Sequence, residues 1–340
     1  MINKAYEKLK QFIKENYKIL LLYIVLFVVF TYHLPYYIYV GGGTIDVNQR
    51  IEIENETESE GSFNLAYVSE IKATIPTLLL SKIMPSWDVV KVDDLTLGKN
   101  ESEEDVLVRD KLYLNDANQN AIKVAYEKAG KQFKVTGVDL VIVYIVDDAK
   151  TDLKVGDIIV EINNTKIDNF EKLSEKIASY EVNDRISFTV IRNNKKQKCY
   201  AVLQKMNDKN MIGISFMQKV NYKTDPLISL KFKKEETGPS GGLMTAISIY
   251  DKLVEKDITK GLKIVGTGTI NSDGTVGSIG GVKYKLNGAI RANADVFIVP
   301  NEENYDEVMK IVNEKKYDIK IIGVSTFDEA IEKLDKISFE

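Results

Sequence analysis

The chain has 340 residues and a formal net charge of −4, and 28% of its side chains are charged. At about 150 residues per domain, this length predicts about two domains. The single cysteine, Cys199, and the single histidine, His33, exclude an internal disulfide, a multi-cysteine metal site and a histidine cluster for zinc. His33 lies inside an apolar run, which leaves the rest of the chain without a histidine for a Ser-His-Asp triad. A hydrolase of this composition needs a lysine or a carboxylate as its base, and we expect no metal and no cofactor.

Residues 19–40 form a run of 22 residues without a charged side chain. As a helix rising about 1.5 Å per residue the run measures roughly 33 Å, more than the roughly 30 Å hydrocarbon core of a membrane. Residues 1–18 carry five lysines and two glutamates, whereas the remainder of the chain has a net charge of −7. Because positive flanks stay in the cytoplasm, we expect a cytoplasmic tail (1–18), a single-pass anchor in the cell membrane (19–40) and an extracytoplasmic catalytic domain. The alternative is a cleaved signal peptide, which the length of the run and the lack of an A-x-A site disfavour.

Residues 41–110 are expected to form an extracytoplasmic segment, with strands within residues 44–90 and a solvated connector over residues 91–110. The next apolar and alanine residues recur at helical spacing and end at Gly130, which predicts a helical connector over residues 111–132.

Residues 133–206 show a strand pattern with one helix, and Asn193-Asn194 supplies the turn between the last two strands. This segment resembles a PDZ domain of the bacterial protease-associated kind, above all in Leu153-Lys154-Val155-Gly156-Asp157-Ile158-Ile159. The resemblance implies that a peptide adds a strand to a sheet edge and places its carboxylate in a backbone nest. The expected peptide-binding residues are those of the candidate carboxylate loop: Gly137, Val138, Asp139 and Leu140.

Ser240 lies in the run Thr237-Gly238-Pro239-Ser240-Gly241-Gly242, directly before a segment whose apolar residues recur at helical spacing. Small residues permit a sharp turn here, and the unpaired N–H groups at a helix start suit an oxyanion. The structural alternative is that Ser240 serves as an N-cap residue, a position that serine favours.

Downstream, Asp273-Gly274 predicts a hairpin turn between residues 263–270 and 275–279. The run Gly280-Gly281-Val282-Lys283-Tyr284-Lys285 then opens a second helix, and buried strands follow at 295–300 and 319–324. Helical phase does not choose between Lys283 and Lys285, because both lie near the edge of the apolar face.

Together, Gly-Pro-Ser-Gly-Gly, Gly-Thr-Gly, Gly-Gly-Val-Lys-Tyr-Lys and a strand ending in proline resemble the proteolytic domain of the Lon family, which uses a Ser-Lys dyad. With the expected anchor and PDZ segment, the chain resembles the membrane-anchored PDZ–Lon-like serine proteases of Gram-positive bacteria. The resemblance implies Ser240 as nucleophile, Lys285 as general base and Thr267 as a hydroxyl that orients the lysine. It also implies oxyanion contacts from the backbone around Gly238 and Gly241, and homo-oligomers.

Two positions depart from the family pattern: Thr237 stands where many Lon enzymes carry an acidic residue, and Gly241 where alanine is common. A lysine base must be neutral, so its pKa must fall by about 3 units, from near 10.4 to about 7–8. Burial against Val282 and Leu286 is expected to supply this shift. No Gly-x-x-x-x-Gly-Lys-Ser/Thr loop occurs in the sequence, so we expect proteolysis without ATP.

The sequence therefore predicts an α+β protein with an N-terminal transmembrane helix, a PDZ domain and a Lon-type proteolytic domain over residues 207–340. Because 207–340 is short for that domain, we expect strands from residues 41–110 to complete it. The expected function is serine endopeptidase activity on extracytoplasmic proteins or peptides, with no nucleic acid partner. The alternatives are a catalytically inactive PDZ scaffold that binds peptides, and a lipase or esterase, which the missing Gly-x-Ser-x-Gly motif disfavours.

Overall fold

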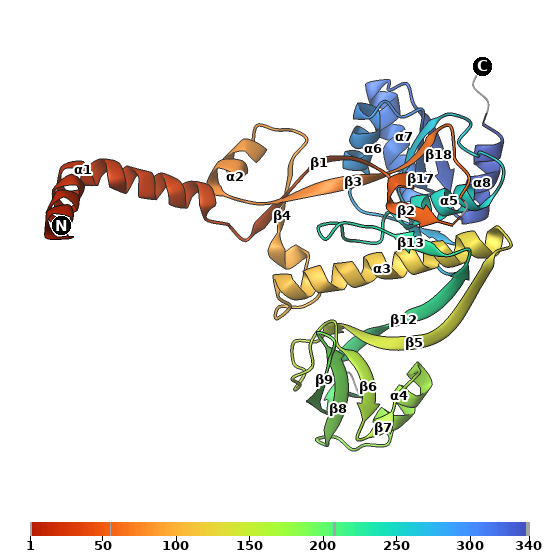
Figure 1. Ribbon diagram of the computed structural model, residues 1–340, viewed down its shortest axis with the longest axis horizontal. Helices are drawn as coiled ribbons and strands as arrows, with labels where there is room; N and C mark the ends of the chain where they lie inside the picture. Colours follow the sequence, from red (N-terminus) through yellow and green to blue (C-terminus); the bar gives the residue numbers. More distant parts are fainter. Residues whose placement is uncertain (1, 55, 207–208, 338–340) are drawn as a thin grey trace. The chain divides into compact units, whose positions relative to one another are not determined.

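The computed structural model describes residues 2–54, 56–206 and 209–337 (Figure 1). The chain forms two units, one comprising residues up to 40 together with 69–95, and the other comprising residues 41–68 and 96 onward. Each unit is described by itself below.

The first unit begins with helix α1 (Ile2–Thr31), which ends before the expected boundary at Val40. Pro35 cannot continue a helix, and the β-branched and aromatic residues after it favour an extended chain. Tyr36 accordingly opens strand β1 (Tyr36–Asp46), which pairs antiparallel with β4 (Asp88–Lys91). The short helix α2 (Ile75–Ser81), which starts with a capping box at Thr74, and a 3-10 turn (Val92–Asp94) complete this unit. The prediction of one helix over residues 19–40 is therefore wrong.

Among the residues that the structure describes, no helix has both the length and the apolar character needed to cross a membrane.

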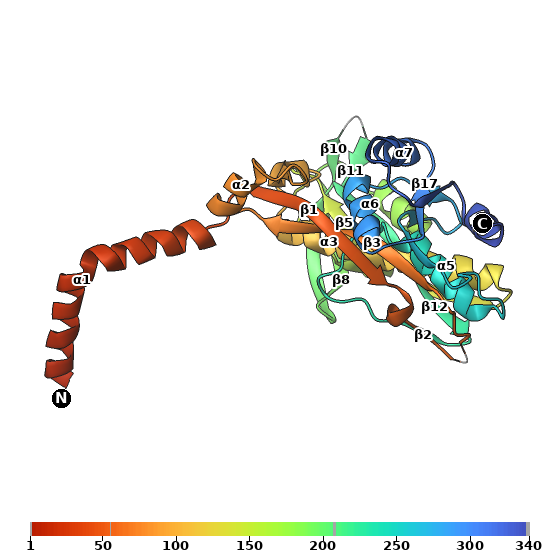
Figure 2. The ribbon, with the colours of Figure 1, turned by 90° about the horizontal axis from the view of Figure 1, so that it is seen from above.

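The second unit contains a sheet in the order β18-β17-β14-β3-β1. Its strands β1, β3 and β17 are labelled in Figure 2. Strands β3 (Ser62–Lys72), β14 (Lys263–Gly266), β17 (Val296–Pro300) and β18 (Lys320–Val324) run parallel. Neighbouring residues of these strands point to opposite faces. Ile264 and Ile298 join the core formed with α5 (Gly242–Leu253) and α8 (Phe327–Asp335), whereas Val265 and Phe297 join α6 (Val282–Arg291) and α7 (Glu303–Lys315). Helices thus cover both faces of the sheet.

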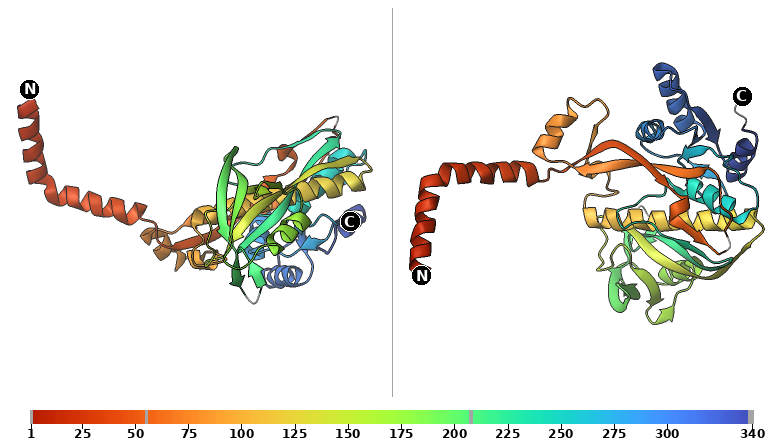
Figure 3. Two further views of the ribbon diagram at one scale, coloured as in Figure 1. Left: turned by 90° about the horizontal axis from the view of Figure 1, so that it is seen from below. Right: turned by 45° about the horizontal axis from the view of Figure 1, so that its top comes forward.

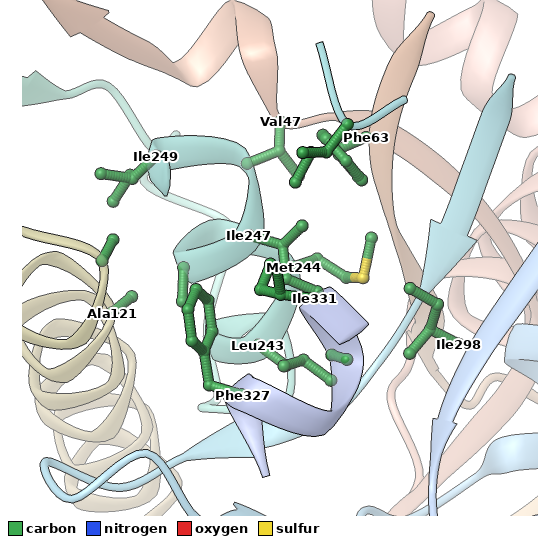
Figure 4. Close-up of a cluster of buried hydrophobic side chains, with 14 of the residues drawn as sticks. Val47, Phe63, Ala121, Leu243, Met244, Ile247, Ile249, Ile298, Phe327 and Ile331 are labelled. Carbon is green, nitrogen blue, oxygen red and sulfur yellow. The ribbon is translucent and has the colours of Figure 1, made fainter. Parts of the chain in front are cut away.

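The N-terminal segment contributes directly to this sheet and its core. Strand β3 lies between β14 and β1, and β2 (Ile51–Ile53) pairs with β13 (Ile228–Leu230). Val47 and Phe63 are fully buried and lie beside Met244 and Ile247 of α5 (Figure 4). Residues 41–68 and the chain after residue 226 therefore share one hydrophobic core.

Helix α3 (Glu103–Lys128) starts eight residues earlier than the expected boundary at residue 111. Ser102 caps the helix by accepting a hydrogen bond from the backbone N–H of Asp105, and three acidic residues occupy the first turn, where they complement the helix dipole. Its alanine face packs on α5: Ala121 and Ala125 are buried in the same core, and Ala117 lies against Gly242 of α5. One core helix thus replaces most of the two connectors that were expected over residues 91–110 and 111–132. The acidic residues at its start belong to its first turn and not to a solvated loop.

A second sheet carries the PDZ-like segment in the order β12-β5-β6-β8-β9, whose strands are labelled in Figure 1. Figure 3 shows this segment from two further sides in yellow-green to green. Its strands are β5 (Gln132–Ile145), β6 (Ile158–Ile162), β8 (Arg185–Arg192), β9 (Lys195–Val202) and β12 (Ile214–Asp225), with β7 (Thr165–Lys166) beside β6. Helix α4 (Phe170–Ala178) is capped by Asn169, and Asn193 and Asn194 take positive φ values in the expected turn. A short hairpin (β10, Gln204–Met206, and β11, Lys209–Met211) precedes β12, which extends this sheet beyond the expected boundary at residue 206.

Strands β5 and β12 pair along their whole length, from Ile145↔Ile214 to Gln132↔Asp225. At one end Ile145 and Phe216 pack on the core of the PDZ-like sheet. At the other end Phe133 and Tyr222 stack at 5.0 Å and pack on the α3–α5 core.

Replacing Phe63 with alanine tests whether residues 41–68 belong to the proteolytic core. Because Phe63 is fully buried, Phe63→Ala should lower the free energy of unfolding by about 3–5 kcal/mol. Urea unfolding followed by circular dichroism measures this, with Ile71→Ala on the same strand, 38% exposed, as the control. Equal, small losses in the two variants would contradict a shared core.

Candidate active site

Ser240 lies in the loop that leads into α5, and its backbone is fixed by the loop after β14. The Ser240 carbonyl accepts hydrogen bonds from the Gly268 N–H at 2.8 Å and from the Thr267 hydroxyl at 3.0 Å. A side chain at Gly242 would place its Cβ 2.8 Å from Ile270, so only glycine permits this close approach of α5. Ser240 itself is half-buried.

The two glycines expected around an oxyanion differ in the structure. Gly238, at φ +84°, donates its N–H to the carbonyl of Asp110 in α3 at 3.1 Å, so this N–H is already engaged. This hydrogen bond competes with the expected role of Gly238 as an oxyanion donor, which stays a prediction. Gly241 is the N-cap residue of α5, and its N–H and that of Ser240 have no acceptor among the residues described. These two N–H groups sit at the positive end of the α5 dipole and suit a developing negative charge.

Lys285 lies in the first turn of α6 and is almost completely buried, with 4% of its surface exposed. Burial disfavours the ammonium form and lowers the pKa of Lys285 from its ordinary 10.5 to about 8. Lys283, on the same turn, is half-buried and lies over the Tyr284 ring at 4.9 Å. The structure thus separates two lysines that the sequence pattern left equivalent.

Thr267 connects the other two expected residues. Its hydroxyl, fully buried, donates to the Ser240 carbonyl and accepts a hydrogen bond from Lys285 Nζ at 3.2 Å. Its own N–H is held by Ile298 of β17 at 3.0 Å. Ser240, Thr267 and Lys285 are therefore brought together by the end of β14 and the starts of α5 and α6.

Glu236, which precedes Thr237 in the same loop, does not take the place of the acidic residue expected at position 237. Glu236 pairs with Arg50 at 2.6 Å and accepts the Lys233 N–H at 2.7 Å, which directs it to a structural ion pair. The sequence reasoning missed Asp110, whose carbonyl holds Gly238. Asp110 is in helical register with Ala117 and Ala121, the residues that face α5, and this spacing was the available signal.

The expected carboxylate loop of the PDZ-like segment is not a loop. Gly137, Val138 and Asp139 lie inside β5 and pair with Asn221, Val220 and Lys219 of β12. Leu140 is 1% exposed and belongs to the core of this sheet. The expectation of a loop is wrong, and β12 already pairs with this edge of β5. The peptide-binding role of these four residues stays a prediction.

The outer edge of β12 is the candidate peptide-binding edge that sequence reasoning missed. β12 ends the strand order, so within the described chain no further strand pairs along that side. Phe216 of β12 contacts Phe170 of α4, with ring centroids 5.4 Å apart, and both Ile214 and Phe216 are half-buried. Gly213, at φ +73°, turns the chain into this strand. The run Gly213-Ile214-Ser215-Phe216 was the signal in the sequence.

Comparison with known families matches both segments. Residues 233–335 match the Lon protease (S16) C-terminal proteolytic domain, and residues 128–201 match the PDZ domain. The chain contains a Lon-type proteolytic domain and a PDZ domain. The Lon-type match includes Ser240, Thr267 and Lys285, whereas α3 and strands β1–β3 lie outside it.

The similar proteins include Lon proteases from several organisms. The chain is 33% identical over 97 residues to Lon protease of Aster yellows witches'-broom phytoplasma, which covers 28% of this chain and 12% of that protein. It is 36% identical over 95 residues to Lon protease of Campylobacter concisus, covering 28% of this chain and 11% of that protein. The chain therefore spans only a small part of the length of these relatives. A solved PDZ domain of an SdrC-like protein from Listeria monocytogenes matches 23% of this chain and 85% of its own, at 21% identity and a TM-score of 0.22.

Replacing Lys285 with methionine tests the burial of its amine. The unfolded chain keeps the Lys285 proton up to about pH 10.5 and the folded chain only up to about pH 8, so below pH 8 folding carries the full cost of burying the charge. Lys285→Met should therefore raise the free energy of unfolding by about 1–3 kcal/mol at pH 7. The gain should shrink between pH 8 and 10.5, as urea unfolding at pH 7 and 9.5 measures. Lys283→Met is the control, and a gain independent of pH would contradict the shifted pKa.

Proposed function

We propose that the chain is a serine endopeptidase in which Ser240 is the nucleophile and Lys285 is the general base. The observation that carries this proposal is the buried Lys285 amine, whose pKa is lowered to about 8 and which donates to the same Thr267 hydroxyl that donates to the Ser240 carbonyl. The Lon-type match over residues 233–335 supports the same reaction class.

The chemistry follows from these groups. Neutral Lys285 takes the proton of the Ser240 hydroxyl while Ser240 Oγ attacks a peptide carbonyl. The N–H groups of Ser240 and Gly241 stabilise the resulting oxyanion. The protonated lysine then gives its proton to the leaving amine, and it activates the water that hydrolyses the acyl-enzyme. Thr267 keeps the lysine oriented because its own hydrogen is committed to the Ser240 carbonyl.

The proposed reaction does not use ATP, because the sequence contains no phosphate-binding Gly-x-x-x-x-Gly-Lys-Ser/Thr loop. We also propose that the N-terminal segment attaches the chain to a membrane and that the catalytic domain acts outside the cytoplasm. The lysine-rich residues 1–18 and the exposed apolar side chains of α1, such as Phe27 at 69% and Leu21 at 57%, support this proposal.

Cleavage of an unfolded protein substrate by purified full-length chain tests the mechanism. Ser240→Ala and Lys285→Met should each lower kcat/KM by at least about 1,000-fold, because either change removes one half of the dyad. For the unsubstituted chain, kcat/KM should rise about tenfold per pH unit below pH 8 and level off above it, since only the neutral amine acts as base.

Lys283→Met should cleave like the unsubstituted chain and serves as the matched control. Cleavage that survives both Ser240→Ala and Lys285→Met would refute the dyad. An unsubstituted chain that cleaves nothing but retains peptides would favour the inactive scaffold.

The PDZ domain favours a second function, the binding of extended peptides along the outer edge of β12. Addition of a strand to a sheet edge gives affinity through main-chain hydrogen bonds, and apolar side chains beside the edge give specificity. Ile214, Phe216 and the partly exposed Phe170 of α4 supply such side chains here.

Replacing Phe170 with aspartate tests this edge. Phe170→Asp should weaken the binding of peptides with apolar C-terminal residues by about tenfold or more, because it places a charge beside the apolar edge and near the peptide carboxylate. Fluorescence anisotropy with a labelled peptide library measures the change. The control, Val182→Asp, alters a similarly exposed residue beyond α4. Equal binding by both variants would place the peptide elsewhere.

A further inference from the structure

The residues that lead into and begin helix α3 contact both the PDZ domain and the loop that carries Ser240. We call residues 97–110 the α3 N-terminal segment. It lies outside both family matches, which begin at residues 128 and 233. Neither family model therefore assigns this segment a part in catalysis.

On one side this segment binds the PDZ domain at the end of β5. The Asp147 carboxylate accepts the N–H groups of Lys99 at 2.9 Å and Asn100 at 2.8 Å, and the Asn100 side chain donates to the Asp147 carbonyl at 3.1 Å. These amide hydrogen bonds lower the pKa of Asp147. A second contact joins Val108 to Gly156 of the PDZ domain. A Cβ added to this glycine would lie 3.1 Å from a methyl group of Val108.

On the other side the segment holds the nucleophile loop. The carbonyl of Asp110 accepts the Gly238 N–H at 3.1 Å, two residues before Ser240. Gly238 has φ +84°, a backbone conformation that glycine adopts without strain. Because Pro239 fixes the next φ angle, the position of Gly238 largely sets the direction in which the chain reaches Ser240.

A buried ion pair locks the two sides of the segment together. Arg109 and Glu101 hydrogen-bond to each other, and their side chains are 7% and 2% exposed. Glu101 also accepts the Leu97 N–H at 2.7 Å, and Arg109 lies 3.8 Å from the Asp110 carboxylate. The turn that binds Asp147 and the helical turn that binds Gly238 are thus tied by one pair of side chains.

We propose that Glu101 and Arg109 are positioning residues for Ser240, and that the α3 N-terminal segment couples the nucleophile loop to the PDZ domain. As far as catalysis is concerned, this inference rests on the proposed serine-protease function. The position of Gly238 can be measured without any cleavage.

The test compares Arg109→Lys and Asp147→Asn with the unsubstituted full-length chain. Arg109→Lys keeps the charge but loses the planar fork that pairs with Glu101. Asp147→Asn keeps the shape but weakens the hold on the Lys99 and Asn100 amides. Asp148→Asn is the matched control, because Asp148 is exposed and has no polar partner in the described part of the chain.

Two readouts are expected to change together. Amide hydrogen exchange at Gly238 should become about tenfold faster in both variants, while exchange in the buried helix α5 stays unchanged. The kcat for peptide cleavage should fall about tenfold with KM within about twofold, because a misplaced nucleophile weakens the transition state more than substrate binding. The pH midpoint near 8 should not move, since Lys285 is untouched.

Unchanged Gly238 exchange in both variants would overturn the proposal, as would faster exchange spread equally through α5. If Arg109→Lys does not fold, Asp147→Asn alone decides, because its contacts lie nearer the surface. If the unsubstituted chain and Ser240→Ala show the same lack of cleavage, the proposed function fails. The exchange measurement then still confirms or refutes the positioning of the loop.

Discussion

The candidate active site depends on one buried hydroxyl. Thr267 donates its only hydroxyl hydrogen to the Ser240 carbonyl, which leaves its lone pairs to accept from Lys285 Nζ. The Thr267 hydroxyl therefore positions the lysine, and no acidic side chain of the described chain pairs with it. Burial keeps the pKa of Lys285 at about 8, below its ordinary 10.5. A carboxylate at this place would stabilise the ammonium form and remove the base.

The proteolytic sheet explains why residues so distant in sequence are needed for one site. Thr267 follows β14, and β14 lies between β17 and β3, so the strand before the site is supported on one side by the N-terminal segment. Residues 41–68 and helix α3 complete the core around α5, the helix that Ser240 precedes. The PDZ domain is inserted between these parts, and the family match at residues 233–335 covers only the later one.

The chemistry-bearing motifs could be predicted from sequence because they are local: Gly-Pro-Ser-Gly-Gly and Gly-Gly-Val-Lys-Tyr-Lys each specify a turn and a helix start. The hairpin at Asp273-Gly274 and the Asn193-Asn194 turn were predicted on the same ground, and β15 (Thr269–Ile270) pairs with β16 (Val276–Gly277) as expected.

The helix over residues 19–40 was mispredicted because the hydrophobicity of the run was given more weight than the effect of Pro35. Gly137 was mistaken for a loop residue because a glycine in a strand and a glycine in a turn look alike locally. The contact between Gly238 and Asp110 joins segments 128 residues apart, and no local pattern encodes it.

The insertion of the PDZ domain also has a mechanical consequence. The chain leaves the proteolytic core through β5 and returns through β12, and these two strands are hydrogen-bonded from Gln132↔Asp225 to Ile145↔Ile214. Two hydrogen-bonded strands resist independent movement far better than two single linkers do. The PDZ domain is therefore connected by a two-stranded ribbon that behaves as one unit. A single backbone break in either strand would leave the module held by the remaining ladder, and bending across the ribbon face is the easiest motion left to it.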